Sequence, residues 1–259
     1  MLTRLHPRSA LGALIRLPLR LIPHEYVIRV RAGVNKDMKW IAGSSIHGCW
    51  LGTYEHEKQV LVSALARPGM VVWDIGANAG FYTLAFSRLV GAGGHVYAFE
   101  PIAENTHNLL RHVRLNCLTN TTVIQAALAA QTELVGFQTA SSNSMGQIGA
   151  AGDYMVPAIS ADSFLRKHPA SRPQLLKVDI EGAEALLLTG AKELLTSAAP
   201  EILLALHGEA QAIECRNILG SYGYSLYYLN GSLIGNGPIT DDEILATKSA
   251  FPYRIAAIE

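Results

Sequence analysis

From Val71 onward, short apolar runs alternate with amphipathic segments of helical period. The run VVWDI is followed by FYTLAFSRLV, and HVYAFE is followed by AENTHNLLRHVRLN. Apolar strands that alternate with helices predict a mostly parallel sheet covered by helices on both faces. The expected fold is therefore α/β, with a doubly wound, mostly parallel, Rossmann-like sheet. Further strands are expected at 121–128, 154–160, 174–180, 201–207, 225–230 and 253–259, with 133–139 as a possible hairpin partner of 121–128. Further helices are expected at 161–168, 183–195 and 211–223.

The length and composition allow one main domain. The chain has 259 residues, 49% of them hydrophobic, which suffices for one sizeable core. Residues 1–54 are expected to form an N-terminal helix and hairpin extension, with the hairpin at 26–42, and residues 55–259 the main domain. Residues 138–153 lack periodicity and are rich in Ser, Gly, Ala and Asn. They are expected to form a mobile loop that closes over the acceptor.

The charge and cysteine content restrict the partners and the compartment. Lys plus Arg equal Asp plus Glu, 21 each, so no global field attracts a nucleic acid. Cys49, Cys117 and Cys215 are far apart in sequence and form no CxxC motif. This spacing disfavours a zinc ribbon or a secreted disulfide framework, and it predicts a cytoplasmic protein.

The N-terminal segment MLTRLHPRSALGALIRLPLRLIP contains an apolar stretch. Arg16, Pro18 and Arg20 interrupt it. The uncharged piece is too short for a secretory signal or for the roughly 20 residues of a membrane span. The segment is expected to be an amphipathic helix that caps the domain, with weak peripheral membrane contact as the alternative.

A glycine-containing turn follows the first strand of the alternation. It reads Asp74-Ile-Gly76-Ala-Asn78-Ala-Gly80, and Glu100 ends the next strand. Gly76 and Gly80 let the backbone approach a ligand, and Asn78 tolerates a positive φ. A carboxylate after the second strand can accept hydrogen bonds from the two hydroxyls of a ribose. Together these residues predict a nucleoside site, whereas the turn taken alone is also compatible with a purely structural role.

The motif also restricts the kind of nucleoside. A dinucleotide site favours GxGxxG with a helix N-terminus open to pyrophosphate, whereas here the leading residue, Asp74, would repel phosphate. An acid at this position suits a positively charged ligand such as S-adenosylmethionine. NAD-dependent oxidoreduction is the alternative within enzymes.

Three elements give this chain its resemblance to a known family. With Asp74-Ile-Gly-Ala-Asn-Ala-Gly80, Glu100-Pro101 and Lys177-Val-Asp179-Ile-Glu181-Gly-Ala-Glu184, residues 52–207 closely resemble the FkbM-type S-adenosylmethionine-dependent methyltransferases of class I fold. The resemblance implies O-methylation of a hydroxyl on a sugar, a glycan, a glycolipid or a secondary metabolite. It also implies that the cofactor is held by Asp74, Gly76, Asn78, Gly80, Glu100 and, at its methionine end, Glu55.

Glu55 has a second interpretation, as a solvated acid in the first turn of a helix. The chain also departs from the family pattern. The family often has an acid two residues before its late histidine, where this chain has Ala205 before His207. Any role that depends on such an acid is in question here.

Candidate catalytic residues follow two later strands. Lys177, Asp179 and Glu181 have the period of two that places side chains on one face of a strand, and His207 ends the following strand. For transfer to an alcohol, His207 can act as the base, with Asp179 and Glu181 beside the acceptor hydroxyl and Lys177 paired to an acid.

Two other interpretations of these residues stay open. Asp179, Glu181 and His207 could bind a divalent metal ion, which is not favoured. Alternatively, Asp179 caps a helix that begins near Gly182, Glu181 and Glu184 complement its dipole, and His207 is a structural residue.

Two function classes remain as alternatives. A noncatalytic nucleoside-binding protein would share the same fold and turn. An RNA methyltransferase would use the basic residues near the N-terminus, although zero net charge and the lack of an aromatic-basic RNA motif argue against it. The oligomeric state and the acceptor cannot be deduced from the sequence.

Overall fold

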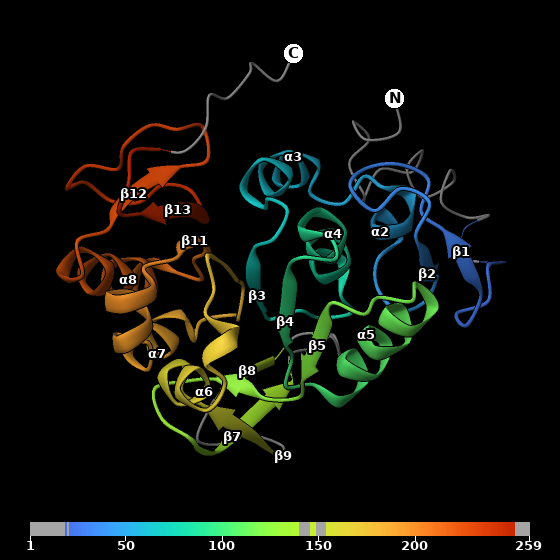
Figure 1. Ribbon diagram of the computed structural model, residues 1–259, viewed down its shortest axis with the longest axis horizontal. Helices are drawn as coiled ribbons and strands as arrows, with labels where there is room; N and C mark the ends of the chain where they lie inside the picture. Colours follow the sequence, from blue (N-terminus) through green and yellow to red (C-terminus); the bar gives the residue numbers. More distant parts are fainter. Residues whose placement is uncertain (1–18, 20, 140–145, 149–153, 252–259) are drawn as a thin grey trace.

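The main sheet of the computed structural model has seven strands in the order β12-β13-β11-β10-β3-β4-β5 (Figure 1). All strands run parallel except β13, which is antiparallel to both of its neighbours. The structure describes residues 19, 21–139, 146–148 and 154–251. The strands are β3 (Val71–Ile75), β4 (His95–Phe99), β5 (Thr121–Ile124), β10 (Leu175–Val178), β11 (Glu201–Ala205), β12 (Ser225–Tyr228) and β13 (Glu243–Thr247).

Helices cover both faces of this sheet, which confirms the doubly wound α/β prediction. Alternate strand residues point to opposite faces, so Val72 packs in one hydrophobic cluster while Trp73 and Ile75 pack in another. The Val72 face is covered by α3 (His56–Leu65), α4 (Phe81–Val90) and α5 (Ala103–Leu115). The Trp73 face is covered by α6 (Ala161–Lys167), α7 (Glu184–Thr189) and α8 (Glu209–Ser221). No helix among the described residues is long and apolar enough to cross a bilayer.

The predicted helix at 183–195 is two segments in the structure. After α7 ends at Thr189, a π-helical turn, η4, spans Leu194–Ala198. The carboxylate of Asp162 accepts hydrogen bonds from the backbone N–H groups of Glu193 and Leu194, each at 3.0 Å. This contact from α6 provides acceptors for backbone N–H groups at the start of the segment that contains η4. Because Asp162 is distant in sequence, the local periodicity does not reveal the break.

The N-terminal hairpin forms as predicted. β1 (Val27–Arg29) and β2 (Lys39–Ile41) pair antiparallel, and the short helix α2 (His47–Leu51) follows. Trp40 is fully buried and stacks on His112 of α5, with ring centroids 4.0 Å apart. Because Trp40 shares a hydrophobic cluster with Val72, the extension packs against the same sheet face as α3 and α4. The domain boundary at residue 54 stays a prediction.

A second, smaller sheet corrects the expectation for residues 121–160. It has the order β6-β9-β7-β8, formed by β6 (Ala127–Leu128), β7 (Glu133–Thr139), β8 (Gly146–Ile148) and β9 (Tyr154–Ile159). The hairpin expected between 121–128 and 133–139 is wrong, because β9 lies between β6 and β7. Strand pairing of this kind depends on contacts distant in sequence, so local patterns do not reveal it.

The loop predicted at 138–153 is also wrong in part. β8 lies within it and pairs antiparallel with β7. Residues 140–145 and 149–153 fall outside the described residues, so the proposed closure over the acceptor stays a prediction.

One strand of the main sheet was missed in the sequence analysis. β13 is buried between β11 and β12, and no strand was expected at its residues. The predicted closing strand at 253–259 lies outside the described residues. The strand predicted at 225–230 is confirmed as β12.

Candidate active site

A cavity of about 180 Å³ lies beyond the carboxyl ends of β3, β4 and β10. The chain proceeds from β3 to β4 and β5 in one direction and from β10 to β11 in the other, so strand order reverses between β3 and β10. Ligands of open α/β sheets bind at such reversal points. The lining includes Gly76, Asn78, Glu100, Lys177, Asp179 and Glu181.

The turn after β3 has the backbone geometry that its sequence predicts. Gly76, Asn78 and Gly80 all have positive φ, at 79°, 50° and 97°. The N–H groups of Gly76 and Ala77 both donate to the carbonyl of Phe99, each at 3.0 Å, which ties the turn to the end of β4. The turn therefore forms a fixed wall of the cavity.

Gly76→Ala should destabilise the protein strongly. A Cβ at Gly76 would lie 1.9 Å from the carbonyl oxygen of Asp179. This oxygen belongs to the backbone, so it can move away only if the end of β10 is distorted. We expect a loss of about 3 kcal/mol or more in the free energy of unfolding, measured by urea denaturation. Gly69→Ala is the matched control, because Gly69 has a similar φ of 87° but no heavy atom within 4 Å of the added Cβ. Equal losses in the two variants would contradict the steric argument.

Glu100 is held rigidly at the cavity. One carboxylate oxygen accepts from the N–H of Asn78 at 2.8 Å, and the other from the N–H of Ile102 at 2.9 Å. Burial raises the pKa of Glu100, while these backbone hydrogen bonds act in the opposite direction. The side chain thus links the glycine turn to the start of α5, where Asn105 also donates to it at 3.3 Å, and it lines the cavity.

Three residues predicted to hold the cofactor do not line the cavity. Asp74 is fully buried beneath the turn, where its carboxylate accepts from the Thr83 hydroxyl at 2.6 Å. Gly80 directly precedes α4, and a Cβ added to it would contact Leu109 of α5 and not the cavity. Glu55 accepts from the Tyr82 hydroxyl at 2.6 Å, and Tyr82 does line the cavity. Their direct contact with a cofactor stays a prediction.

Lys177 is buried between two acids, as its predicted pairing requires. Its ammonium lies 3.2 Å from Asp179 and 3.9 Å from Asp74. Burial alone would lower the pKa of Lys177, but the carboxylates of Asp179 and Asp74 outweigh burial and raise it. Lys177 in turn lowers the pKa of Asp179. The pair is therefore ionised at neutral pH, and Lys177 is unsuited to act as a base.

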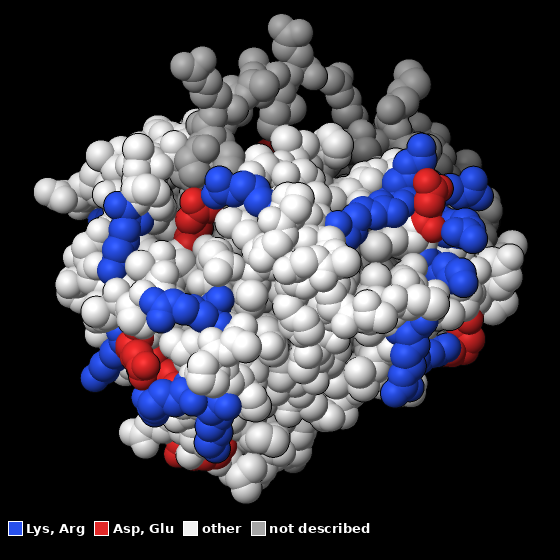
Figure 2. Space-filling model, viewed as in Figure 1, with Lys and Arg blue, Asp and Glu red and all other residues white. Residues whose placement is uncertain are grey.

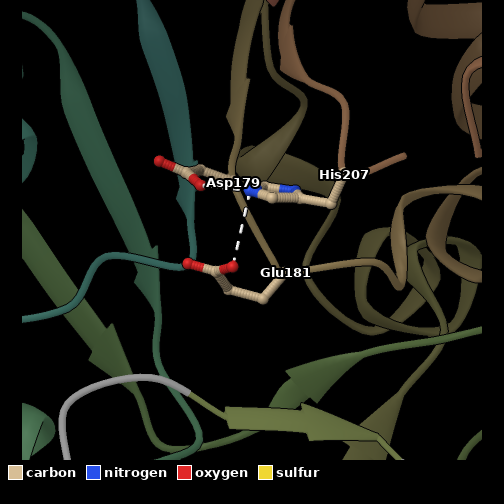
Figure 3. A group of neighbouring side chains, drawn as sticks. All are labelled: Asp179, Glu181 and His207. Atoms are coloured by element: carbon tan, nitrogen blue, oxygen red, sulfur yellow. Dashed lines mark ion pairs between the residues drawn. The ribbon is translucent and has the colours of Figure 1, made fainter. Parts of the chain in front are cut away.

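Asp179, Glu181 and His207 converge at the edge of the cavity, although they come from two strand ends (Figure 3). The Nε2 atom of His207 lies 3.5 Å from a Glu181 oxygen and 3.7 Å from an Asp179 oxygen. Glu181 has a φ of 53°, which is unusual for a residue other than glycine. This backbone turn aims the Glu181 side chain back toward His207.

Glu184 is the partner of His207 that the sequence analysis missed. Its carboxylate is completely buried and lies 2.7 Å from Nδ1 of His207. Its other oxygen, Oε2, has no hydrogen-bond partner among the described residues. A proton on Nδ1 is therefore held by Glu184, which leaves Nε2 directed at Asp179 and Glu181. The only sequence signal was the last acid of the DxEGxE element.

The helix-capping role considered for Asp179 is wrong. α7 has Ala183 at its N-cap and no side-chain cap, and the N–H of Gly182 donates to Glu184 at 3.0 Å. Asp179 instead pairs with Lys177 at the cavity.

Replacing Glu184 should lower the pKa of His207. The hydrogen bond to Glu184 raises this pKa above its ordinary value; partial burial opposes the shift, and the charges of Glu184, Glu181 and Asp179 add to it. In Glu184→Gln the neutral amide cannot stabilise the imidazolium, so His207 should titrate at lower pH than in the wild type. Histidine resonances in a ¹⁵N NMR titration measure the change. Glu209→Gln, on the first turn of α8, is the control that should leave the titration of His207 unchanged.

The arrangement offers two kinds of chemistry. A neutral His207 can take a proton at Nε2, and the nearby carboxylates then stabilise the imidazolium. The same three side chains also each offer a ligand atom within 4.8 Å of one another, which is close enough to bind a divalent cation.

The N-terminal extension contributes to the cavity wall, which the sequence analysis did not anticipate. Trp40, Ser45, Cys49 and Tyr54 all line it. Phe137 of β7 lines it from the second sheet. The cavity wall is thus completed by the N-terminal extension and by the second sheet.

Comparison with known proteins places these features in a family. A model of the methyltransferase FkbM domain matches residues 74–226. Hexuronic acid methyltransferase AglP of Haloferax volcanii is 25% identical over 130 residues, which cover 49% of this chain and 52% of AglP. The chain thus spans about half the length of this curated relative.

Similar solved structures include two methyltransferases. Methyltransferase FkbM from Methylobacillus flagellatus KT has a TM-score of 0.49 and 17% identity, over 74% of this chain and 55% of that one. Precorrin-6y C5,15-methyltransferase from Geobacter metallireducens GS-15 has a TM-score of 0.47 and 14% identity, over 74% and 86%. Because the FkbM domain model covers more than half of the chain, and the glycine turn and the DxEGxE element lie within it, the chain belongs to the FkbM methyltransferase family.

Proposed function

We propose that this protein is an S-adenosylmethionine-dependent O-methyltransferase that acts on a sugar hydroxyl. The observation that carries the proposal is the adjacency of two features. The cavity walled by the glycine turn and Glu100 is also lined by Asp179 and Glu181, and His207 contacts both of these carboxylates. Family membership supports methyl transfer as the reaction.

The residues at the cavity fit the cofactor. Glu100 would accept hydrogen bonds from the ribose hydroxyls, and the turn at Gly76 and Asn78 would lie against the methionine part. Asp74 would act indirectly, by holding Lys177 and, through it, Asp179. The bound cofactor would supply an electrophilic methyl group on a sulfonium.

The reacting end handles the proton of the acceptor. As the acceptor oxygen forms its bond to the methyl carbon, the carbon–sulfur bond breaks and the hydroxyl proton moves to Nε2 of His207. Glu184 keeps the other proton of His207 on Nδ1, so Nε2 remains free to accept. Asp179 and Glu181 would position the hydroxyl and stabilise the imidazolium. Positioning the oxygen in line with the sulfonium contributes most of the rate.

A sugar acceptor is supported by the relative AglP, whose name specifies hexuronic acid methylation. The test compares glycans and glycolipids from cells with and without the gene by mass spectrometry. A species lighter by about 14 Da in the cells without the gene, converted back by purified protein and S-adenosylmethionine, is the expected result. Methylation confined to RNA, or no methyl difference in any sugar, would refute the proposal.

A further inference from the structure

One face of the molecule, away from the cavity, combines basic and apolar side chains. β1 and β2 pair so that Arg29 lies directly opposite Lys39, and Val27 points to the same side as Arg29. Val27 also lines a shallow groove with Arg111, Arg114 and Leu115 of α5. We call this set the hairpin face; it comprises Val27, Arg29, Lys39, Arg111, Arg114 and Leu115.

The positive charge on the hairpin face is largely uncompensated. Glu25 pairs with Arg111 at 2.6 Å. Within the described part of the chain, Arg29, Lys39 and Arg114 form no ion pair with a carboxylate. In Figure 2, Lys and Arg side chains predominate along the edge where α5 and the hairpin lie.

Apolar side chains are exposed beside these cations. Leu21 is 83% exposed, Tyr26 57% and Val27 41%. Tyr26 and Val27 are adjacent at the start of β1, and Leu21 lies five residues before Tyr26. A nucleic acid offers no apolar phase in which Leu21 and Val27 could be buried, whereas the boundary of a bilayer does.

The sequence before β1 has the same combination of basic and apolar residues. Residues 1–24 contain Arg4, Arg8, Arg16 and Arg20 among many leucines, and no Asp or Glu. The first acid of the chain is Glu25. Since the whole chain has zero net charge, this concentration of positive charge is local.

We propose that the hairpin face, with the exposed apolar side chains of Leu21 and Tyr26 beside it, binds the surface of membranes that contain anionic phospholipids. The cations contact lipid phosphates, and Leu21, Tyr26 and Val27 enter the headgroup boundary. Each Lys or Arg near such a surface strengthens partition by about fivefold. This inference does not depend on methyl transfer, because the face does not line the cavity.

The test is sedimentation of the full-length protein with lipid vesicles. We expect binding to phosphatidylcholine vesicles that contain about 30% phosphatidylglycerol at about 50 mM salt, and at least tenfold weaker binding at about 500 mM. Vesicles of phosphatidylcholine alone should bind far less. Tyr26→Ser/Val27→Ser should weaken binding at both salt concentrations.

A matched pair of variants locates the binding surface. Lys39→Gln/Arg114→Gln removes two exposed cations from the hairpin face and should weaken vesicle binding at least fivefold. Lys167→Gln/Lys192→Gln removes two exposed cations near α6, away from the hairpin in Figure 1, and should not. Circular dichroism and melting temperature check that both pairs are folded. No binding to anionic vesicles, equal binding to neutral ones, equal losses in the two variants, or displacement of the vesicles by an RNA oligonucleotide would each overturn the inference.

Discussion

His207→Ala should lower turnover by about 10²-fold or more on the true acceptor, with little change in cofactor affinity. The reason is that Nε2 of His207 lies beside Asp179 and Glu181 and can accept a proton when the ring is neutral. Rates measured under single-turnover conditions test the chemical step directly. In the wild type the rate should rise with pH through the elevated pKa of His207, because the base must be neutral.

His207→Gln is the control for a structural effect. The glutamine amide can donate to Glu184 as Nδ1 does, so the buried carboxylate keeps a partner, but it cannot accept the proton. If His207 only supports the fold, His207→Gln should be nearly as active as the wild type. Any loss of activity in either variant should then parallel its drop in melting temperature. A folded His207→Ala enzyme with full activity would refute the base assignment.

A metal site at the same residues predicts a different pattern. EDTA should then abolish activity, Mg²⁺ or Mn²⁺ should restore it, and Asp179→Asn should be as damaging as His207→Ala. With His207 as the base, activity should survive EDTA, and Glu184→Gln should shift the pH profile to lower pH.

Glu100→Ala should weaken the binding of S-adenosylmethionine by more than tenfold and toward 10²-fold. A hydrogen bond to a charged group contributes about 1.5–3 kcal/mol, and a ribose can make two. Isothermal calorimetry with S-adenosylhomocysteine measures the loss without turnover. The variant also frees the N–H groups of Asn78 and Ile102, so its melting temperature must be measured alongside.

Glu100→Gln separates the two effects. It fills the same volume and retains an oxygen acceptor for one backbone N–H, but its NH2 group faces the other N–H and it lacks the negative charge. We expect a smaller loss of stability than in Glu100→Ala, together with weakened cofactor binding. Unchanged affinity in both variants would remove Glu100 from the ribose role, and tight binding of NADH by the wild type would favour the dinucleotide interpretation.

The sequence by itself determined the parallel strands of the main sheet, the glycine turn and the residue types at the site. Local information suffices there, because the apolar runs at 71–75 and 95–99 alternate with amphipathic helices, and each strand is followed directly by the helix that packs on it. The positive φ of Asn78 agrees with the tolerance of asparagine for this conformation, which its residue type alone indicates. Parallel strands place their carboxyl ends at one edge, so Asp179 and His207 were expected to meet.

Only the tertiary structure decided which groups touch. Glu184 and His207 are 23 residues apart, and their contact depends on how α7 begins beside the end of β11. The same holds for Asp74, whose carboxylate turns inward to Thr83 and Lys177 instead of lining the cavity. The pairing of β6 with β9 and the insertion of β13 likewise depend on long-range contacts. Periodicity reports which face of an element is buried, but it does not report which partner buries that face.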